Sequence, residues 1–305
     1  MITEKQSFEA HLLTRNYSPA TVTDYGYSLK DFIGFLLTKG VSDVRGITTV
    51  LIADYQIHRL QKLNVYGKPC GVGNRNNALK AVKAFCRYLY KLGFIGDDPA
   101  RDVDFARMPK RLPRNILTPS EMRKLLQTPD RQSLLGQRDR CMMELLYSSG
   151  LRNKELRTLK FTDLNLEEGI LQVVDGKGHK DRYVPVGRVA CRHLSHYIAV
   201  VRPLLLGKGS DDTLFLTLYG KPIGKRSVIN AVERYVGLAG IKKSITPHSF
   251  RHTCATHLLQ NKANIRHIQE ILGHVSLQTT QIYASVTIQE LKDAHTSCHP
   301  RNLDV

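Results

Sequence analysis

The sequence has no run of apolar residues that approaches the roughly 18 needed to cross a membrane as a helix. Its first residues, MITEKQSFEAHLL, include acidic side chains and no apolar segment followed by a small-residue cleavage site, so they do not resemble a signal peptide. The six cysteines are scattered without a CxxC pair, which is typical of reduced thiols rather than of a disulfide framework. We therefore expect a soluble, cytoplasmic protein that makes no membrane contact.

Several common catalytic signatures are also missing from the sequence. It has no HExxH zinc motif, no Walker A loop and no Rossmann fingerprint. The segment GKPIGKRS, residues 220–227, comes nearest to a phosphate-binding loop, but it is one residue short between its glycines and has Arg226 where a hydroxyl side chain is required. We interpret this segment as a turn that enters a helix. We predict no nucleotide, metal or other cofactor.

Positive charge is what the sequence has in excess. The 305 residues include 45 Lys and Arg against 27 Asp and Glu, which gives a formal net charge of +18. Up to residue 115 there are 18 basic and 10 acidic residues, and after it 27 and 17, so the excess is spread along the chain. This balance is typical of a protein that binds a polyanion, and nucleic acid is the leading candidate. We expect both halves of the chain to contact it.

Helical spacing of apolar residues dominates the first hundred positions. The clearest helix is expected to have Ser18 as its N-cap and Pro19 as its first residue, and to end at Gly40. Two more helices are expected over residues 48–61 and 74–93. This part of the chain is therefore predicted to be an all-α domain.

The second half of the sequence is predicted to be mainly helical with a small antiparallel sheet. Thr118, Pro119 and Glu121 form a capping-box pattern at the start of a helix. Residues 169–186 alternate between apolar and polar side chains around a Gly-rich turn, which indicates a β-hairpin, and weaker strand signals occur near residues 166–168 and 213–217. We therefore expect an α+β domain after the all-α domain.

A basic segment separates the two predicted domains. Residues 98–115 contain three prolines and five basic residues, and we assign residues 1–97 and 116–305 to the domains on either side. The segment is either an extended strap along a phosphate backbone or an ordinary solvated linker. The candidate DNA-binding residues, whose alternative is a solvated face, are Arg75, Lys80, Lys83, Arg87, Lys110, Arg111 and Arg114.

The stretch TPHSFRHTCATH holds three histidines and a cysteine within ten residues. Their spacing matches neither the paired ligands of a structural zinc site nor a catalytic zinc helix, so we predict no metal site. On a helix that begins at Pro247, His248 and Arg251 lie on one face and are placed to contact a shared ligand. The alternative is a buried, histidine-rich helix.

Five short stretches occur in one order along the chain: SGLRNKEL, GKGHKDRYVPV, HSFRHT, LGH and TTQIYASV. In these stretches the chain resembles the tyrosine recombinases, also called the phage integrase family, and among them the compact Xer-like and mobile-element members. The positions that match the family's catalytic residues are Arg152, Lys177, His248, Arg251, His274 and Tyr283. The resemblance extends over nearly the whole length, because the helical N-terminal part is similar to the family's core-binding, SAM-like domain.

The resemblance implies a site-specific recombinase that cleaves and rejoins DNA without ATP or metal. The reaction of the family passes through a 3′-phosphotyrosine and exchanges strands through a Holliday junction. Tyr283 would be the nucleophile, and since a free tyrosine has a pKa of about 10 it needs help to lose its proton. Arg152 and Arg251 suit the phosphate because a guanidinium stays charged and matches two phosphate oxygens.

The remaining family residues imply proton transfer and orientation. Lys177 resembles the general acid for the leaving 5′ oxygen, and His248 resembles the residue that exchanges a proton with the nucleophile. His274 would add a donor to the phosphate. Glu155 matches an acidic position that orients the first arginine, with a surface ion pair as the alternative.

Two other functions fit parts of the same pattern. One is a type IB topoisomerase, which reseals the strand it cuts, and the other is a DNA-binding regulator that has lost catalysis.

The expected partners are double-stranded DNA and further copies of the chain. The two domains are expected to form a clamp on the DNA, and a C-terminal docking tail is expected to link four copies into a tetramer on two DNA sites. A paralogous recombinase or an accessory protein is a further candidate partner. The biological role, DNA integration and excision or dimer resolution, stays open.

Overall fold

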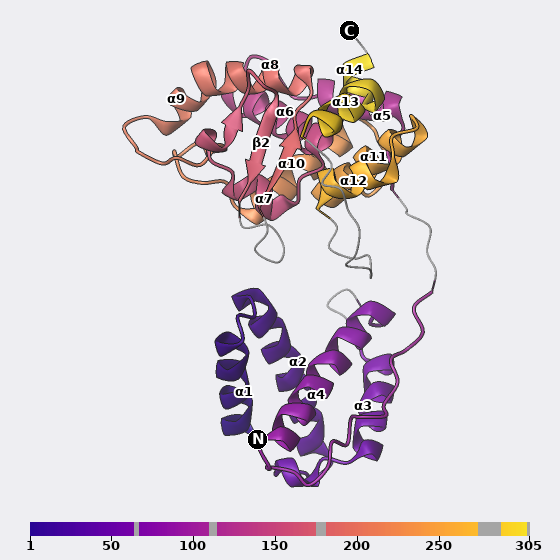
Figure 1. Ribbon diagram of the computed structural model, residues 1–305. Coiled ribbons are helices and arrows are strands. Elements are labelled where there is room, and N and C mark those ends of the chain that lie inside the picture. The colour runs from indigo at the N-terminus through magenta and orange to yellow at the C-terminus, as the bar shows by residue number, and fades with distance from the viewer. Residues whose placement is uncertain (64–66, 110–114, 175–180, 274–287, 304–305) are drawn as a thin grey trace. The chain divides into compact units, whose positions relative to one another are not determined.

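The computed structural model describes residues 1–63, 67–109, 115–174, 181–273 and 288–303. It divides into two compact units, Met1–Arg111 and Leu112–Val305, which we describe separately (Figure 1).

The described residues of the N-terminal unit form a helical bundle. Its helices are α1 (Ile2–Thr14), α2 (Pro19–Thr38), the short 3-10 helix η1 (Val44–Gly46), α3 (Thr49–Gln61) and α4 (Val72–Lys91). The sequence predicts α2 correctly at both ends. Its first turn is capped by Ser18, whose Oγ accepts from the Thr21 N–H at 3.2 Å, and Gly40 beyond its end has φ +76°.

Helix α1 has no counterpart among the helices expected from the sequence. Phe8 and Leu12 on this helix are buried, and the Phe8 ring lies 5.5 Å from Phe85 and 5.2 Å from Tyr88 on α4. Packing against α4 therefore stabilises a short helix that would be marginal in isolation.

The segment from residue 98 to 109, predicted to be part of the linker, packs on the N-terminal unit. Ala100 and Val103 are buried in its core. Asn76 on α4 donates to the Ala106 carbonyl at 2.8 Å and accepts from the Ala106 N–H at 3.0 Å. Lys83 donates to the carbonyls of residues 101 and 103. Side chains of α4 thus pair the backbone groups that a non-helical segment cannot pair by itself.

The C-terminal unit is built around one central helix. Its helices are α5 (Pro119–Gln127), α6 (Leu134–Ser149), α7 (Asn153–Thr158), η2 (Phe161–Asp163), α8 (Arg188–His196), the π-helical η3 (Tyr197–Val201), α9 (Arg202–Leu206), α10 (Lys225–Leu238), α11 (Pro247–Gln260), α12 (Ile265–Leu272), α13 (Ile288–Cys298) and α14 (Pro300–Leu303). Every residue of α6 from Cys141 to Ser149 is buried. A helix buried all round is a core element, and α5, α8, α11 and β3 pack against it.

The small sheet of this unit is antiparallel, with the strand order β1-β2-β3. Its strands are β1 (Leu164–Asn165), β2 (Ile170–Val173) and β3 (Arg182–Pro185). In the register, Leu171 lies opposite Val184 and both are buried, as the alternating pattern predicts. The tip of the predicted hairpin, residues 175–180, lies outside the described residues. The expected strand near 213–217 is present only as isolated bridges, at Thr213 and Leu216.

Helices α13 and α14 dock on the unit that carries them. His295 Nε2 contacts the Ser148 carbonyl at 2.6 Å, and His299 Nε2 contacts the Tyr147 carbonyl at 3.1 Å, both at the end of α6. Both histidines are buried. The Arg301 guanidinium donates to both carboxylate oxygens of Glu144, at 3.1 and 2.6 Å. The sequence predicts a short helix and tail here, and the structure adds that they cover the central helix.

The mainly α fold with a small antiparallel sheet is therefore confirmed. Among the described residues, no helix is both long and apolar enough to span a membrane.

Candidate active site

A tight turn between α6 and α7 places Arg152. Gly150 ends α6 with φ +59°, and a Cβ at this position would lie 2.6 Å from Cδ2 of Leu272. Glycine is therefore required both by the backbone conformation and by the contact with α12. Arg152 is the N-cap residue of α7, and its N–H donates to Oε2 of Glu155 at 2.8 Å. The first turn of α7 thus fixes the backbone of Arg152.

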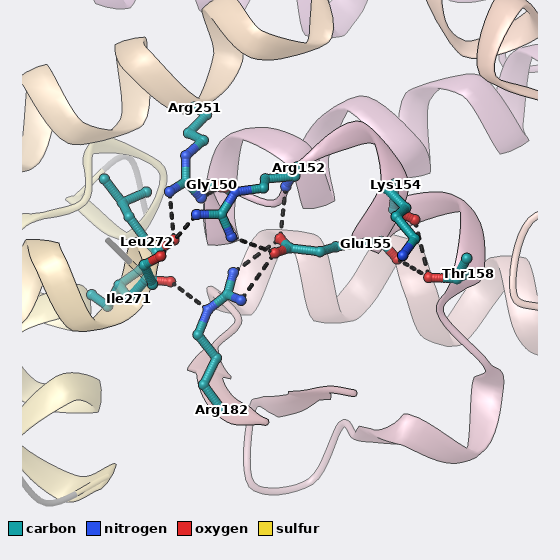
Figure 2. A network of polar contacts seen from close by, with 10 residues as sticks. Gly150, Arg152, Lys154, Glu155, Thr158, Arg182, Arg251, Ile271 and Leu272 are labelled. Atoms are coloured by element: carbon teal, nitrogen blue, oxygen red, sulfur yellow. Dashed lines mark hydrogen bonds and ion pairs between the residues drawn. The ribbon is translucent and has the colours of Figure 1, made fainter. Parts of the chain in front are cut away.

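Two arginines that are distant in sequence meet at the end of α12. Nη2 of Arg152 donates to the Gly273 carbonyl at 2.8 Å. Arg251, on α11, donates from Nη1 to the Gly150 carbonyl at 2.8 Å and from Nη2 to the Leu272 carbonyl. Figure 2 shows these contacts converging from three elements. The carbonyls at a helix C-terminus carry partial negative charge, so they hold the two guanidinium groups side by side despite their like charge.

The two arginines differ in their exposure. Arg251 is 3% exposed, and burial, followed by repulsion from Arg152, lowers its pKa to about 10. At neutral pH it still carries its charge. The side chain of Arg152 is 26% exposed. Arg251 is thus a fixed buried cation, while part of Arg152 is open to a ligand.

Arg182 is a third member of the site, and the sequence motifs assign it no role. It is the first residue of β3, and its Nη1 and Nη2 donate to Oε1 and Oε2 of Glu155 at 3.0 and 2.9 Å. Glu155 also accepts from Nη1 of Arg152 at 2.6 Å. Burial alone would raise the pKa of Glu155, but hydrogen bonds and charge from Arg182, with hydrogen bonds from Arg152, lower it to about 2. The carboxylate is therefore ionised at neutral pH, and its ion pairs with Arg152 and Arg182 lie at a buried position.

His248 lies on α11 one turn before Arg251, and it is exposed to solvent. Partial desolvation lowers the pKa of His248, and the nearby His252, Arg251 and Arg152 lower it further. The rings of His248 and His252 are 4.5 Å apart in an edge-to-face arrangement. His248 is thus neutral at neutral pH, and a neutral imidazole can accept a proton.

Three of the predicted catalytic residues, Lys177, His274 and Tyr283, lie outside the described residues. The structure brings Arg152, Glu155 and Arg251 together, and His248 lies one turn before Arg251 on α11. The residue that precedes His274 in the chain is Gly273, which accepts from Arg152.

The predicted DNA-binding residues of α4 differ in their surroundings. Lys80 and Arg87 are exposed, whereas Arg75 is partly buried. The Lys83 ammonium donates to the Arg101 and Val103 carbonyls at 3.0 and 2.7 Å and lies 5.7 Å from the centre of the Phe105 ring. In this structure Lys83 therefore binds the segment after α4. Three further candidates lie outside the described residues, namely Lys110, Arg111 and Arg114.

The other histidine of the TPHSFRHTCATH stretch is part of the core. His257 is buried, with Nδ1 2.8 Å from the Tyr147 hydroxyl and Nε2 2.9 Å from the Leu117 carbonyl. Both of its ring nitrogens are therefore engaged within the fold. Within the part of the chain that the structure describes, no group of three or more His, Cys, Asp or Glu side chains could hold a metal ion.

Comparisons with known proteins identify the family. The model of the phage integrase family matches residues 115–290, which is more than half of the chain. Tyrosine recombinase XerC 2 of Ralstonia nicotianae is 37% identical over 296 residues, which cover 97% of this chain and 85% of the relative. Tyrosine recombinase XerD of Staphylococcus aureus is 33% identical over 291 residues, which cover 95% of each.

A solved structure supports the fold. The lambda integrase tetramer bound to a Holliday junction is similar to this chain with a TM-score of 0.68 at 20% identity, over 93% of this chain and 80% of that one. The family match, the two relatives and the convergent arginines agree with the motifs in the sequence. The chain belongs to the phage integrase family and is a tyrosine recombinase of the Xer-like type.

Proposed function

We propose that the chain cleaves and rejoins DNA at specific sites, with Tyr283 as the nucleophile. The tyrosine oxygen attacks the scissile phosphorus, the bond from phosphorus to the 5′ oxygen breaks, and a 3′-phosphotyrosine and a 5′-hydroxyl result. Attack by the 5′-hydroxyl of another strand reverses the step and exchanges the strands. The observation that carries this proposal is the meeting of Arg152 and Arg251 at the end of α12.

The two arginines have the task of stabilising negative charge on the phosphorane. Together with Arg182 and Glu155 they form a group of three guanidiniums and one carboxylate, so an approaching phosphate meets a net positive charge. Each preorganised donor of this kind contributes on the order of 3 kcal/mol to transition-state stabilisation. Because Glu155 and the carbonyls of α12 already fix both guanidiniums, little reorganisation is needed when the phosphate binds.

Proton transfer is assigned to His248 and Lys177. His248 accepts the proton of Tyr283, a role supported by its lowered pKa, which leaves the imidazole neutral. Lys177 donates a proton to the leaving 5′ oxygen, since expulsion of an alkoxide is very unfavourable. His274 adds a donor to the phosphate.

A covalent adduct assay tests the proposal. The protein is incubated with a nicked duplex that carries its site, and the products are separated under denaturing conditions. Wild type should form a protein–DNA adduct, and Tyr283→Phe should form none. If wild type forms no adduct, or Tyr283→Phe forms as much, the proposal fails.

The same experiment separates the alternatives. An inactive DNA-binding regulator would bind the duplex without forming an adduct. A type IB topoisomerase would form the adduct but reseal only the strand it cut. Transfer of the labelled strand to a second duplex is the outcome expected of a recombinase.

The partners follow from the same reaction. The working assembly is a tetramer on two double-stranded DNA sites, and the fold it shares with the lambda integrase tetramer supports this arrangement. The exposed Lys80 and Arg87 of the N-terminal unit contact DNA phosphates, so that both units bind the duplex.

Helices α13 and α14 form the docking tail, which moves from its own central helix to that of a neighbouring subunit. A second recombinase or an accessory protein completes the assembly at some sites. Light scattering of the protein on its site measures the number of subunits.

A further inference from the structure

Arg182 joins three elements that surround the active site. Besides its two bonds to Glu155, its Nε donates to the Ile271 carbonyl at 3.3 Å. Its side chain also lies against Gly273, where a Cβ would be 3.0 Å from Cδ of Arg182. One guanidinium thus links β3, the first turn of α7 and the end of α12 (Figure 2).

Glu155 is shared between two arginines. Oε1 accepts from Nη1 of Arg152 at 2.6 Å and from Nη1 of Arg182 at 3.0 Å, while Oε2 accepts from the N–H of Arg152 at 2.8 Å and from Nη2 of Arg182 at 2.9 Å. The side chain of Glu155 is 6% exposed, so water is a poor substitute for a lost donor. If Arg182 no longer donates, the carboxylate is left with Arg152 alone and draws its guanidinium away from a phosphate.

Arg182 itself is badly placed to bind a phosphate. All three of its guanidinium nitrogens donate to acceptors within the protein, two of them to the charged carboxylate of Glu155. Any effect of Arg182 on the reaction therefore passes through the groups it holds.

We propose that Arg182 is a positioning residue, which saturates Glu155 and so keeps the guanidinium of Arg152 directed at the scissile phosphate. This inference rests on the function proposed above, in which Arg152 binds that phosphate. A planar, three-point contact is what this role requires, because it fixes the direction of the carboxylate as well as its charge. The same contact fixes the start of β3 against α7.

Arg182→Lys is the first test, since lysine keeps the charge but not the planar contact. With a nicked duplex, the single-turnover rate of adduct formation should fall roughly 10- to 100-fold, as expected for a displaced catalytic group. The DNA dissociation constant should change less than about twofold, because Arg182 makes no phosphate contact of its own. Arg45→Lys is a matched control. Arg45 makes a two-point contact with Asp43, but that pair is exposed on the N-terminal unit, so the rate should stay at the wild-type value.

A scissile methylphosphonate distinguishes positioning from a general structural role. This group lacks one negative charge, so its reaction depends less on the direction of a guanidinium. The rate deficit of Arg182→Lys should therefore be several-fold smaller on the methylphosphonate than on the phosphate, as should that of Arg152→Lys. Equal deficits of Arg182→Lys on the two substrates would overturn the inference.

A second variant tests whether Arg182 acts through the carboxylate of Glu155. Glu155→Gln keeps the shape of the side chain and removes its charge, and thermal unfolding shows whether each variant is folded. If both residues act through Arg152, the double variant should be no slower than the slower single variant. If the rate deficit of the double variant equals the product of the two single deficits, the two residues do not act through Arg152 together. If wild type forms no adduct, the proposed function fails; if wild type does and Arg182→Lys matches it, only this inference fails.

Discussion

Arg251 donates from Nη1 to the carbonyl oxygen of Gly150 at 2.8 Å, across 101 positions of sequence. This bond attaches α11 to the turn that carries Arg152. Gly150 also packs closely against the side chain of Leu272. The two arginines are therefore both attached to the end of α12. Changes to either arginine should therefore affect catalysis and stability to different extents.

Arg251→Lys should lower the rate of adduct formation about 100- to 1000-fold, the usual effect of losing one preorganised donor. It should also reduce the free energy of unfolding by about 1–3 kcal/mol, since lysine cannot reach both the Gly150 and Leu272 carbonyls and leaves one buried acceptor unpaired. Arg152→Lys should show a similar rate loss with a smaller stability loss, because Arg152 is partly exposed. Single-turnover kinetics and urea unfolding measure the two effects. Equal stability losses would contradict the distinction.

Gly150→Ala should destabilise the protein by roughly 1–3 kcal/mol, because alanine is strained at φ +59° and its Cβ would meet Leu272. The displaced turn should also slow adduct formation. Gly34→Ala is the matched control. Gly34 lies inside α2, where an added methyl group would meet no neighbouring atom within 4 Å, so alanine there should stabilise the helix by about 0.5–1 kcal/mol. Urea unfolding compares the stabilities of the two variants. An unchanged free energy of unfolding for Gly150→Ala would contradict the prediction, because it would show that the turn accommodates the added methyl group.

Acid should weaken the docking of α13 and α14. His295 Nε2 faces the Ser148 carbonyl and so carries the proton, which leaves Nδ1 to accept from Asn302 at 3.2 Å. Burial lowers the pKa of His295 from 6.5 to about 4. Between pH 6.5 and 4, His295 is therefore mostly protonated in the unfolded chain and mostly neutral in the folded chain. The contribution of His295 to stability is constant above pH 6.5 and falls as the pH drops towards 4, by about 2 kcal/mol at pH 5.

Urea unfolding between pH 7.5 and 5 measures this loss, and hydrogen exchange locates it in residues 288–303. His295→Gln, which keeps a donor for Ser148, should reduce the pH dependence. His196→Gln should leave it unchanged, because His196 is exposed. A pH profile of His295→Gln identical to wild type would contradict the assignment.

Two basic residues of α4 should respond differently to removal of their charge. Lys83→Met should reduce the free energy of unfolding of the N-terminal unit, since the Arg101 and Val103 carbonyls lose their donor. Arg87→Met, at an exposed position, should leave that free energy unchanged. It should instead weaken DNA binding, and it should reduce by about 1 the steepness with which the logarithm of the binding constant falls with the logarithm of the salt concentration, here called the salt slope. Salt titrations of DNA binding and thermal unfolding check the pair, and a lower salt slope for Lys83→Met with unchanged stability would reverse the assignments.

The sequence is most informative where a local signal determines the structure. Ser18, Thr118 and Pro247 begin helices at the expected positions, because capping depends on a few neighbouring residues. The family motifs also identify Arg152 and Arg251, which the structure brings together.

Contacts between distant residues could not be read in this way. The pairing of Arg182 with Glu155 spans 27 positions and depends on how β3 packs beside α7. The packing of residues 98–109 on α4 depends on Asn76 and Lys83. The sequence assigned Asn76 no role and indicated Lys83 only as a candidate DNA contact. In both cases the sequence does not show which backbone or charged groups become buried in the folded chain and therefore need a hydrogen-bond partner.

The docking of α13 and α14 on α6 also bears on how the protein is made. Ser148 and His295 are 147 positions apart, and Tyr147 and His299 are 152 apart. During synthesis, α6 leaves the ribosome long before the residues that cover it. The apolar surface that α13 and α14 cover, and the carboxylate of Glu144, then lack these partners until the last residues are translated, and transiently exposed apolar surface of this kind favours aggregation.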